Sequence, residues 1–419
     1  QHTVGVQNIR TMAIIQMLLG NMGIAGGGVA AMRGESNVQG STDHALLFHI
    51  WPGYLGAPTA SLPTLSVYNE KRTPKTKEAN SLNWWKNFPK YSASLLRSFY
   101  GMNMSVDEAY RILPKLDDGV NYSWLTIFDQ MYKEKFTGFF AWGMNPACSG
   151  AHSNKVRQAM AKVDWMVNVN LFDNETGSFW RSPGMDPTKI KTEVFMLPCA
   201  ASIEKEGSIA NSGRLQQWRY KAVNPPGEAL PDGDIMSEIF FKVKELYEKN
   251  GGANKEAITQ LTWPYGKMVG KHFHYDPRKV AAEINGFFLE DKKVENPTKK
   301  GEFKEFKKGD LVPTFAWLQA DGSTSSGCWI YCGSVSDKGI LPMRRDTADP
   351  TGLGLTPGWA WSWPVNRRII YNGASVDPQG NPWDPSRAVI KWNGEKWTGD
   401  VPDGAGNPGS GRPPFIMKP

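Results

Sequence analysis

Cysteine is scarce in this sequence: only four of its 419 residues are cysteine, at positions 148, 199, 328 and 332. Only Cys328 and Cys332 are close in sequence. A pair with a three-residue spacer, without a second pair or a histidine nearby, is a poor metal site. An unliganded cysteine behaves as a small hydrophobic residue. The sequence therefore predicts buried thiols and no metal site, and it excludes an iron–sulfur cluster held by this chain alone.

Long apolar runs and basic arms are also missing. The longest apolar stretch, residues 11–32, contains Gln16, Asn21 and five glycines, which excludes a membrane-spanning helix there. The formal net charge of +7 is spread along the chain, and no basic segment is interleaved with aromatic residues. This distribution argues against a nucleic-acid partner.

The two ends lack the usual signals of a complete chain. The sequence starts "QHTVGVQ", without an initiator Met or a signal-peptide pattern, and it ends "GRPPFIMKP", without a closing helix or strand pattern. We therefore expect an internal piece of a longer polypeptide.

Several catalytic motifs are absent as well. There is no Ser–His–Asp arrangement, no phosphate-binding lysine loop and no G-x-G-x-x-G spacing. Tryptophan, in contrast, is abundant, with 17 residues. A sugar-stacking surface, an apolar funnel and a subunit interface are all compatible with that number.

Periodic apolar residues predict an α/β chain. The βαβ pattern predicts parallel strands, whose carboxyl ends form the usual ligand-binding edge. We expect helices over residues 6–19, 154–163 and 234–252, with helical patches near 92–101 and 105–113. We expect strands over residues 136–142, 164–170 and 192–198.

Polar loops follow these strands. The loop "GMNPACSGAHS" after the first strand contains Gly143, Asn145 and Ser149, which could face a nucleotide, although an ordinary β–α turn explains the loop equally well. An acid in "LFDNETGSFW", residues 171–180, could accept from a guanine or a ribose hydroxyl. Capping by Asp173 or Asn174 is the alternative. The polar stretch 204–214 could form a second clamp or be a simple loop.

One arginine stands in a glycine-rich neutral stretch, "GGGVAAMRGESNVQGSTDH", residues 26–44. A guanidinium suits planar, bidentate capture of a carboxylate, and flanking glycines let the backbone approach closely. The spacing alone favours a surface arginine for Arg33, with an anion clamp delivered into a buried pocket as the sharper alternative. His49, in "ALLFHIW", is by itself more typical of a core histidine than of a site residue.

Read together, these stretches resemble one family. The strongest matches are "TMAIIQMLLGNMGIAGGGVAAMRGESNVQG" (11–40) and "WGMNPACSGAHSNKV" (142–156). "EKEGSIANSGRLQQW" (204–218), "PPGEALPDGDI" (225–235) and "DPTGLGLTPGWAWSWPVNRRIIYN" (349–372) support them. Over essentially all its residues the chain resembles the catalytic subunit of molybdenum- or tungsten-dependent formate dehydrogenases, in the molybdopterin oxidoreductase superfamily.

The resemblance implies specific roles. Arg33 would hold formate's carboxylate beside the metal, with Thr42 and His49 lining the pocket and its entrance. A bis-molybdopterin guanine dinucleotide with Mo or W would be the cofactor. Its candidate contacts in this chain are Gly34, Gly143, Asn145, Ser149, Asn170, Asn211 and Arg214.

The resemblance also implies partners and a location. Formate would be oxidised to CO2, or the reverse, with electrons passed to iron–sulfur clusters, an iron–sulfur subunit and a cytochrome. The Trp-rich end resembles the respiratory, periplasmic branch. The cysteine or selenocysteine metal ligand, the iron–sulfur ligands and a closing barrel domain belong to segments that this sequence does not contain. We therefore expect the piece alone to be inactive.

The resemblance gives a division of the chain into four parts. Residues 1–35 would end a cofactor-binding α/β domain, and 36–200 would form a Rossmann-like dinucleotide-binding domain. Residues 201–269 would be a polar loop and helix that contact the cofactor. Residues 270–419 would be an irregular Trp/Gly/Pro-rich extension that lies over another surface without a core of its own. The rival readings are a nitrate or polysulfide reductase and a non-enzymatic, Trp-rich binding module.

Overall fold

The structure is a computed structural model that describes residues 4–22, 27–76 and 83–349, with short pieces of 356–399 and residues 415–416. The predicted stretches beyond these residues, which include most of 350–357 and 364–375, lie outside the described residues.

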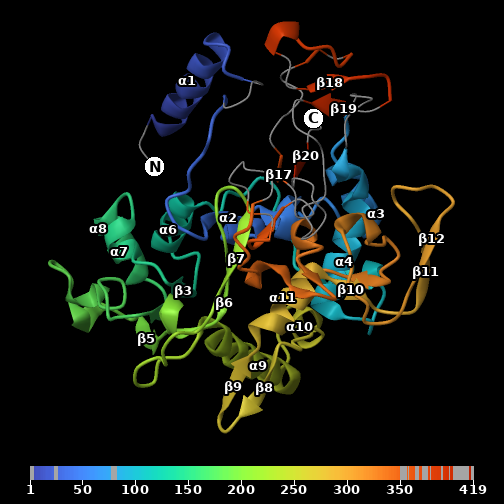
Figure 1. Ribbon diagram of the computed structural model, residues 1–419. Coiled ribbons are helices and arrows are strands. Elements are labelled where there is room, and N and C mark those ends of the chain that lie inside the picture. The colour runs from blue at the N-terminus through green and yellow to red at the C-terminus, as the bar shows by residue number, and fades with distance from the viewer. Residues whose placement is uncertain are drawn as a thin grey trace.

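The α-helices of the described residues all lie before residue 286 (Figure 1). They are α1 Gly5–Leu18, α2 Val38–Asp43, α3 Leu65–Arg72, α4 Phe88–Tyr100, α5 Val106–Ile112, α6 Trp124–Tyr132, α7 Pro146–Ser149, α8 Ser153–Met160, α9 Asp232–Asn250, α10 Lys255–Thr259 and α11 Pro277–Asn285.

The predicted βαβ unit is confirmed. Strands β3 (Gly138–Trp142), β4 (Trp165–Asn170) and β5 (Glu193–Pro198) form a parallel sheet in the order β3-β4-β5. Helices α7 and α8 connect β3 to β4. The two faces of β4 pack differently: Met166 contacts the cluster built on α6 and α8, and Val169 contacts Ile235 of α9. The fold class is therefore mixed α/β with a parallel sheet.

The remaining strands form small sheets. An antiparallel sheet in the order β16-β7-β6 joins Trp361–Ser362, Leu215–Arg219 and Gly207–Ala210. The two-stranded sheets pair β1 Ile50–Trp51 with β2 Leu55–Gly56, β8 Gly266–Val269 with β9 His272–Tyr275, β10 Phe287–Phe288 with β13 Thr324–Ser325, β11 Lys292–Glu295 with β12 Phe303–Phe306, β14 Val335–Ser336 with β15 Gly339–Ile340, β17 Arg368–Ile369 with β20 Phe415–Ile416, and β18 Ile390–Trp392 with β19 Trp397–Gly399.

Helix boundaries follow ordinary capping chemistry. Helix α5 starts with a capping box in which Ser105 and Glu108 bond each other's backbone N–H groups. Helix α9 has acidic residues in its first turn, where they interact favourably with the helix dipole, and it ends at Gly251 with φ +73°. These local signals explain why the predicted helices lie within a few residues of the observed ones.

The first helix differs from the others in its surroundings. Helix α1 stands apart from the body of the molecule in Figure 1, and none of its residues is buried. Its exposed apolar residues include Ile9, Met12 and Leu18. The helix was predicted correctly, but the described residues bury no face of it.

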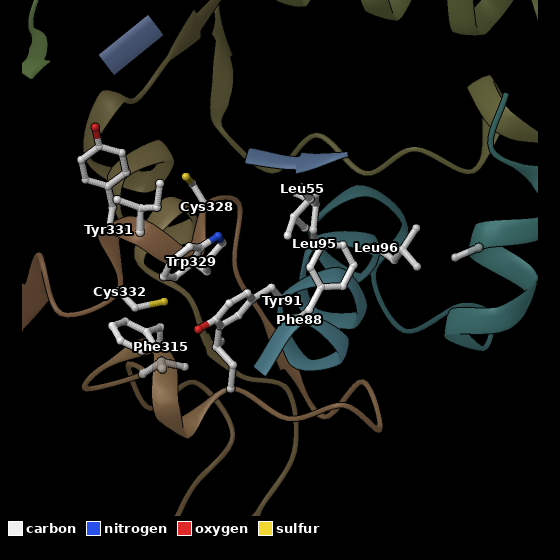
Figure 2. Packing of buried hydrophobic residues seen from close by; sticks show 14 of the residues in the cluster. Leu55, Phe88, Tyr91, Leu95, Leu96, Phe315, Cys328, Trp329, Tyr331 and Cys332 are labelled. Carbon is white, nitrogen blue, oxygen red and sulfur yellow. The ribbon is translucent and has the colours of Figure 1, made fainter. Parts of the chain in front are cut away.

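The Trp/Gly/Pro-rich extension packs against an earlier segment of the chain and shares a core with it. The main core joins buried residues of segment 55–110 to buried residues of segment 288–361. The Trp329 ring stacks on Tyr91 of α4 with centroids 4.2 Å apart and an interplanar angle of 2° (Figure 2). The reason is the apolar area of the aromatic rings, which is buried only when these distant segments meet.

The same packing withdraws several tryptophans from the surface. Trp329 and Trp361 are 5% and 0% exposed. Trp85 lies edge-on against Trp329 at 5.4 Å, also within the core. These rings stabilise the fold, so they are not available to stack on a sugar.

Candidate functional site

The carboxyl edge of the parallel sheet brings predicted residues together. Gly143 donates its N–H to the Val169 carbonyl at 2.8 Å, and the Asn170 amide donates to the Met144 carbonyl at 3.2 Å. Ser149 lies one helical turn further on, donating to the Asn145 carbonyl at 3.0 Å. Gly143 has φ +64°, a conformation that favours glycine. The polar loop after β3 and the end of β4 thus form one polar edge.

Glu175 also belongs to this edge, and sequence reasoning did not single it out. The Asn145 side-chain amide donates to the Glu175 carboxylate at 2.6 Å, and this hydrogen bond is the main reason that the pKa of Glu175 is lowered. The Arg157 guanidinium acts in the same direction from α8, and its Nε is buried without a partner in the described residues. The acid-containing stretch 171–180 was noticed, but its sequence does not say which acid faces the loop.

The neighbouring acid and amide make local hydrogen bonds within the turn, and neither caps a helix, since the next 3-10 helix starts at Phe179 with Ser178 as its N-cap residue. Asn174 Oδ1 accepts from the N–H groups of Thr176 and Gly177 at 3.2 and 3.0 Å. Asp173 accepts from the Ser178 hydroxyl. Both side chains therefore stabilise the turn after β4, which leaves Glu175 as the carboxylate of this edge.

Arg33 lies at the surface of the described chain, as do Gly34 and Glu35. The Arg33 N–H donates to the Ser212 hydroxyl at 2.9 Å, and its guanidinium has no hydrogen bond or ion pair with the described residues. A Cβ at Gly34 would meet no described atom within 4 Å. The expected buried pocket is therefore not formed by these residues, because no described segment covers this stretch.

The stretch 204–214 contains β6 and the turn that leads into β7, and this turn carries two predicted cofactor contacts. Asn211 Oδ1 accepts from the N–H groups of Gly213 and Leu215, both at 3.0 Å. Arg214 contacts the Asp43 carboxylate through Nε and Nη2, both at 3.3 Å. The side chains of Asn211 and Arg214 are thus already engaged by the chain itself.

Asp43 is the buried centre of this region, with 0% exposure. Besides Arg214, the Tyr331 hydroxyl donates to it at 2.7 Å and the Gln39 amide at 2.8 Å. Burial tends to lower the pKa of Arg214 and the Asp43 charge raises it, with a net upward shift. Burial, followed by the Asp43 charge, raises the pKa of Tyr331, so its hydroxyl stays a donor.

The two other predicted pocket residues lie in different surroundings. Thr42 is buried, and its hydroxyl donates to the Val38 carbonyl within α2 at 2.8 Å. His49 is exposed, with its ring edge-on to Phe48 at 5.2 Å, so the core-histidine alternative is wrong for this residue. His44 is the histidine that packs inside: it stacks on Tyr331 at 5.0 Å, and burial lowers its pKa.

Three of the four cysteines are buried, as predicted, and Cys148 is exposed. Within the described ranges, no cluster of three or more His, Cys, Asp and Glu side chains could hold a metal ion. Nor do those ranges contain a helix of the length and hydropathy needed to cross a membrane.

The described residues form a mixed α/β chain with a polar edge on a parallel sheet and, beside a short hairpin, an arginine whose guanidinium has no partner among them. No family model matches the sequence. Full-length comparison with curated proteins is more informative. The chain is 58% identical to the formate dehydrogenase subunit alpha of Megalodesulfovibrio gigas, over 100% of its own length and 41% of that protein.

Two further relatives agree. The chain is 49% identical to the alpha subunit of formate dehydrogenase 2 (cytochrome c-553) of Nitratidesulfovibrio vulgaris and 45% identical to the formate dehydrogenase-O major subunit of Escherichia coli. Each match covers 100% of this chain and 41% of the relative. Over its whole length the chain is similar to the alpha or major subunits of formate dehydrogenases, and it spans about two fifths of the length of each of these relatives.

Proposed function

We propose that this chain carries the formate-binding part of a formate dehydrogenase, which oxidises formate to CO2 or catalyses the reverse reaction. The observation that carries the proposal is the match of the whole chain, at up to 58% identity, to formate dehydrogenase alpha subunits. Arg33 in its glycine-rich stretch supports it, because its guanidinium has no partner within the described part of the chain and could take a small carboxylate.

The chemical role of Arg33 follows from guanidinium geometry. Two parallel N–H groups can hold both carboxylate oxygens of formate, which fixes the plane of the substrate and the direction of its C–H bond. Such a clamp acts more strongly once water is excluded. Other parts of the complete subunit would cover this stretch, and His49 would lie at the pocket entrance, with Thr42 in its wall.

The proposed cofactor is a bis-molybdopterin guanine dinucleotide with Mo or W, held by a Rossmann-like domain of the molybdopterin oxidoreductase fold. The polar edge fits a nucleotide: Gly143 has open space around it, Ser149 carries a hydroxyl, and Glu175 is an acceptor suited to the N–H groups of a guanine. Asn145 and Asn170 complete the edge. When bound, this cofactor would accept the two electrons released by formate.

The electrons would pass to iron–sulfur clusters and an iron–sulfur subunit. One relative's name includes cytochrome c-553, which supports a cytochrome as a further acceptor. The metal and iron–sulfur ligands would come from parts of the subunit that the chain does not span, and the branch it resembles supports a periplasmic location. On this proposal the chain alone would not turn over formate.

The test replaces Arg33 in the complete enzyme. Arg33→Ala removes the charged hydrogen bonds to the substrate carboxylate. The loss of transition-state stabilisation should be at least about 3 kcal/mol, which lowers kcat/KM for formate roughly 150-fold, and KM should rise. Arg33→Lys keeps the charge but loses bidentate contact and should recover only part of this loss. Arg111→Ala is the matched control, since Arg111 is an exposed arginine paired with Glu256 at 3.5 Å.

Viologen-linked assays with formate, nitrate and thiosulfate distinguish the rival reductase functions. An enzyme that turns over nitrate or thiosulfate but not formate would show that formate is not its substrate. Formate turnover of Arg33→Ala within threefold of the wild-type rate would remove Arg33 from the substrate site.

A further inference from the structure

The predicted cofactor contact Arg214 is bound to a buried carboxylate of its own chain. Asp43 accepts four hydrogen bonds, from Gln39 Nε2, the Tyr331 hydroxyl and two guanidinium nitrogens of Arg214. The Arg214 side chain is 28% exposed, and its guanidinium lies over the Trp363 ring at 4.9 Å. A buried carboxylate satisfied by four donors from three segments fixes those segments relative to one another.

One of the segments that Asp43 fixes is the turn of the β6–β7 hairpin, which contains Arg214. Arg214 has φ +53°, an unusual conformation for a non-glycine residue, so surrounding contacts must hold it. Besides the ion pair, Trp363 N–H donates to the Arg214 carbonyl at 3.2 Å, and Ala210 N–H donates to Asn37 Oδ1 at 2.9 Å. The turn is thereby attached to α2 and to its N-cap residue.

The turn, held in this position, contacts the stretch that contains Arg33. The hydrogen bond from Arg33 N–H to the Ser212 hydroxyl spans 179 residues of sequence. It is the one hydrogen bond that residue 33 makes within the described chain. The position of the Arg33 backbone therefore depends on where the turn holds Ser212.

We propose that Asp43 and Arg214 are positioning residues for Arg33, acting through Ser212, and that neither touches substrate or cofactor. This inference rests on the proposed function for its kinetic consequence, while its structural part is independent of that function. In Asp43→Asn, an amide would place an NH2 group or a single neutral oxygen against Arg214. The turn would then lose the contact that opposes its strained conformation.

The experiment uses the complete enzyme with four variants. Asp43→Asn breaks the ion pair, and Ser212→Ala removes only the exposed hydroxyl that accepts from Arg33. Ser212→Thr keeps a hydroxyl and serves as the conservative rescue. Asp234→Asn is the matched control, because Asp234 is 1% exposed and accepts from Tyr275 N–H in another part of the molecule.

Two readouts are measured for every variant. The formate KM is determined, and kcat is normalised to the amount of bound pterin. Hydrogen exchange is followed in peptides that cover residues 29–37 and 207–216. We expect Asp43→Asn and Ser212→Ala to raise the formate KM of the pterin-loaded enzyme at least tenfold. We also expect faster exchange at residues 29–37 in both, with Ser212→Thr and Asp234→Asn close to wild type.

Each outcome decides the inference. The inference is overturned if the pterin-loaded Ser212→Ala enzyme has the wild-type formate KM. It is also overturned if hydrogen exchange at residues 29–37 is unchanged in both variants. A loss of pterin with normal kinetics in the remaining enzyme would mean that the pair is merely structural, which also overturns it. If the wild-type enzyme does not oxidise formate, the proposed function fails, and the exchange result alone then supports or overturns the positioning of Arg33.

Discussion

Trp329→Leu tests the architecture most directly, because Trp329 joins the C-terminal third of the chain to α4. Its ring stacks on Tyr91 at 4.2 Å, and its Nε1 donates to the Gly53 carbonyl at 2.7 Å in the buried core. The ring also fills the space over Gly53, where an added Cβ would lie 2.3 Å from it. The substitution therefore leaves a cavity, an unstacked tyrosine and an unpaired carbonyl.

These losses can be added as an order of magnitude. Large-to-small replacement of a buried tryptophan costs about 3–5 kcal/mol when the residue becomes alanine, and leucine retains roughly half of the side chain, which leaves about 2 kcal/mol. The lost ring stacking adds about 1 kcal/mol, and the lost hydrogen bond adds about 1 kcal/mol. The sum of about 4 kcal/mol corresponds to nearly a 10³-fold change in an opening equilibrium.

Hydrogen exchange on the complete protein measures this change locally. Peptides covering α4, residues 88–100, should exchange several hundredfold faster in Trp329→Leu, because α4 and the segment around Trp329 open together when they share one core. Trp383→Leu is the matched control, since Trp383 is 67% exposed. If residues 315–332 exchange faster while α4 keeps its protection, the two segments are stable independently and the shared core does not exist as an energetic unit.

Three further predictions follow from single sites. Gly143→Ala should lower stability by about 1 kcal/mol because φ is +64°, whereas Gly34→Ala should leave thermal unfolding unchanged, and equal effects would contradict this. Burial raises the pKa of Glu283 above its ordinary value of 4.5. Its stabilising contribution is therefore complete below pH 4.5 and lost as pH rises through the folded-state pKa, so Glu283→Gln should flatten this part of the unfolding profile against pH. Iodoacetamide at pH 8 should modify exposed Cys148 well before Cys332, whose pKa burial raises to about 12, and peptide mass spectrometry would detect the reverse order.

Much of the fold could be predicted because its signals are local. The apolar strands and the helix between them are each written in consecutive residues, and a βαβ unit allows few arrangements. The loop residues Gly143 and Asn145 came with that unit, since their place at the carboxyl edge follows from chain direction. Glu175 did not, because three polar side chains in one turn compete for the same backbone donors and only coordinates show which of them is left over.

Pairings between distant residues could not be predicted. The Trp-rich segment carries the composition of a surface covering, yet Trp329 and Trp361 lie in the core, since burial depends on what the remaining chain offers them. The resemblance assigned Arg214 to the cofactor. Within the described chain its partner is Asp43, which lies 171 residues away.

By itself, the sequence determined the secondary structure of the parallel sheet, the stretch that presents Arg33, and the relation to formate dehydrogenase alpha subunits, because each depends on consecutive residues. The tertiary structure alone decided that Arg33 is exposed in the described chain, that Asp43 holds Arg214, and that distant tryptophans share one core. The physical reason is that burial and ion pairing are properties of contacts between segments, and one sequence pattern is compatible with many such contacts until the chain has folded.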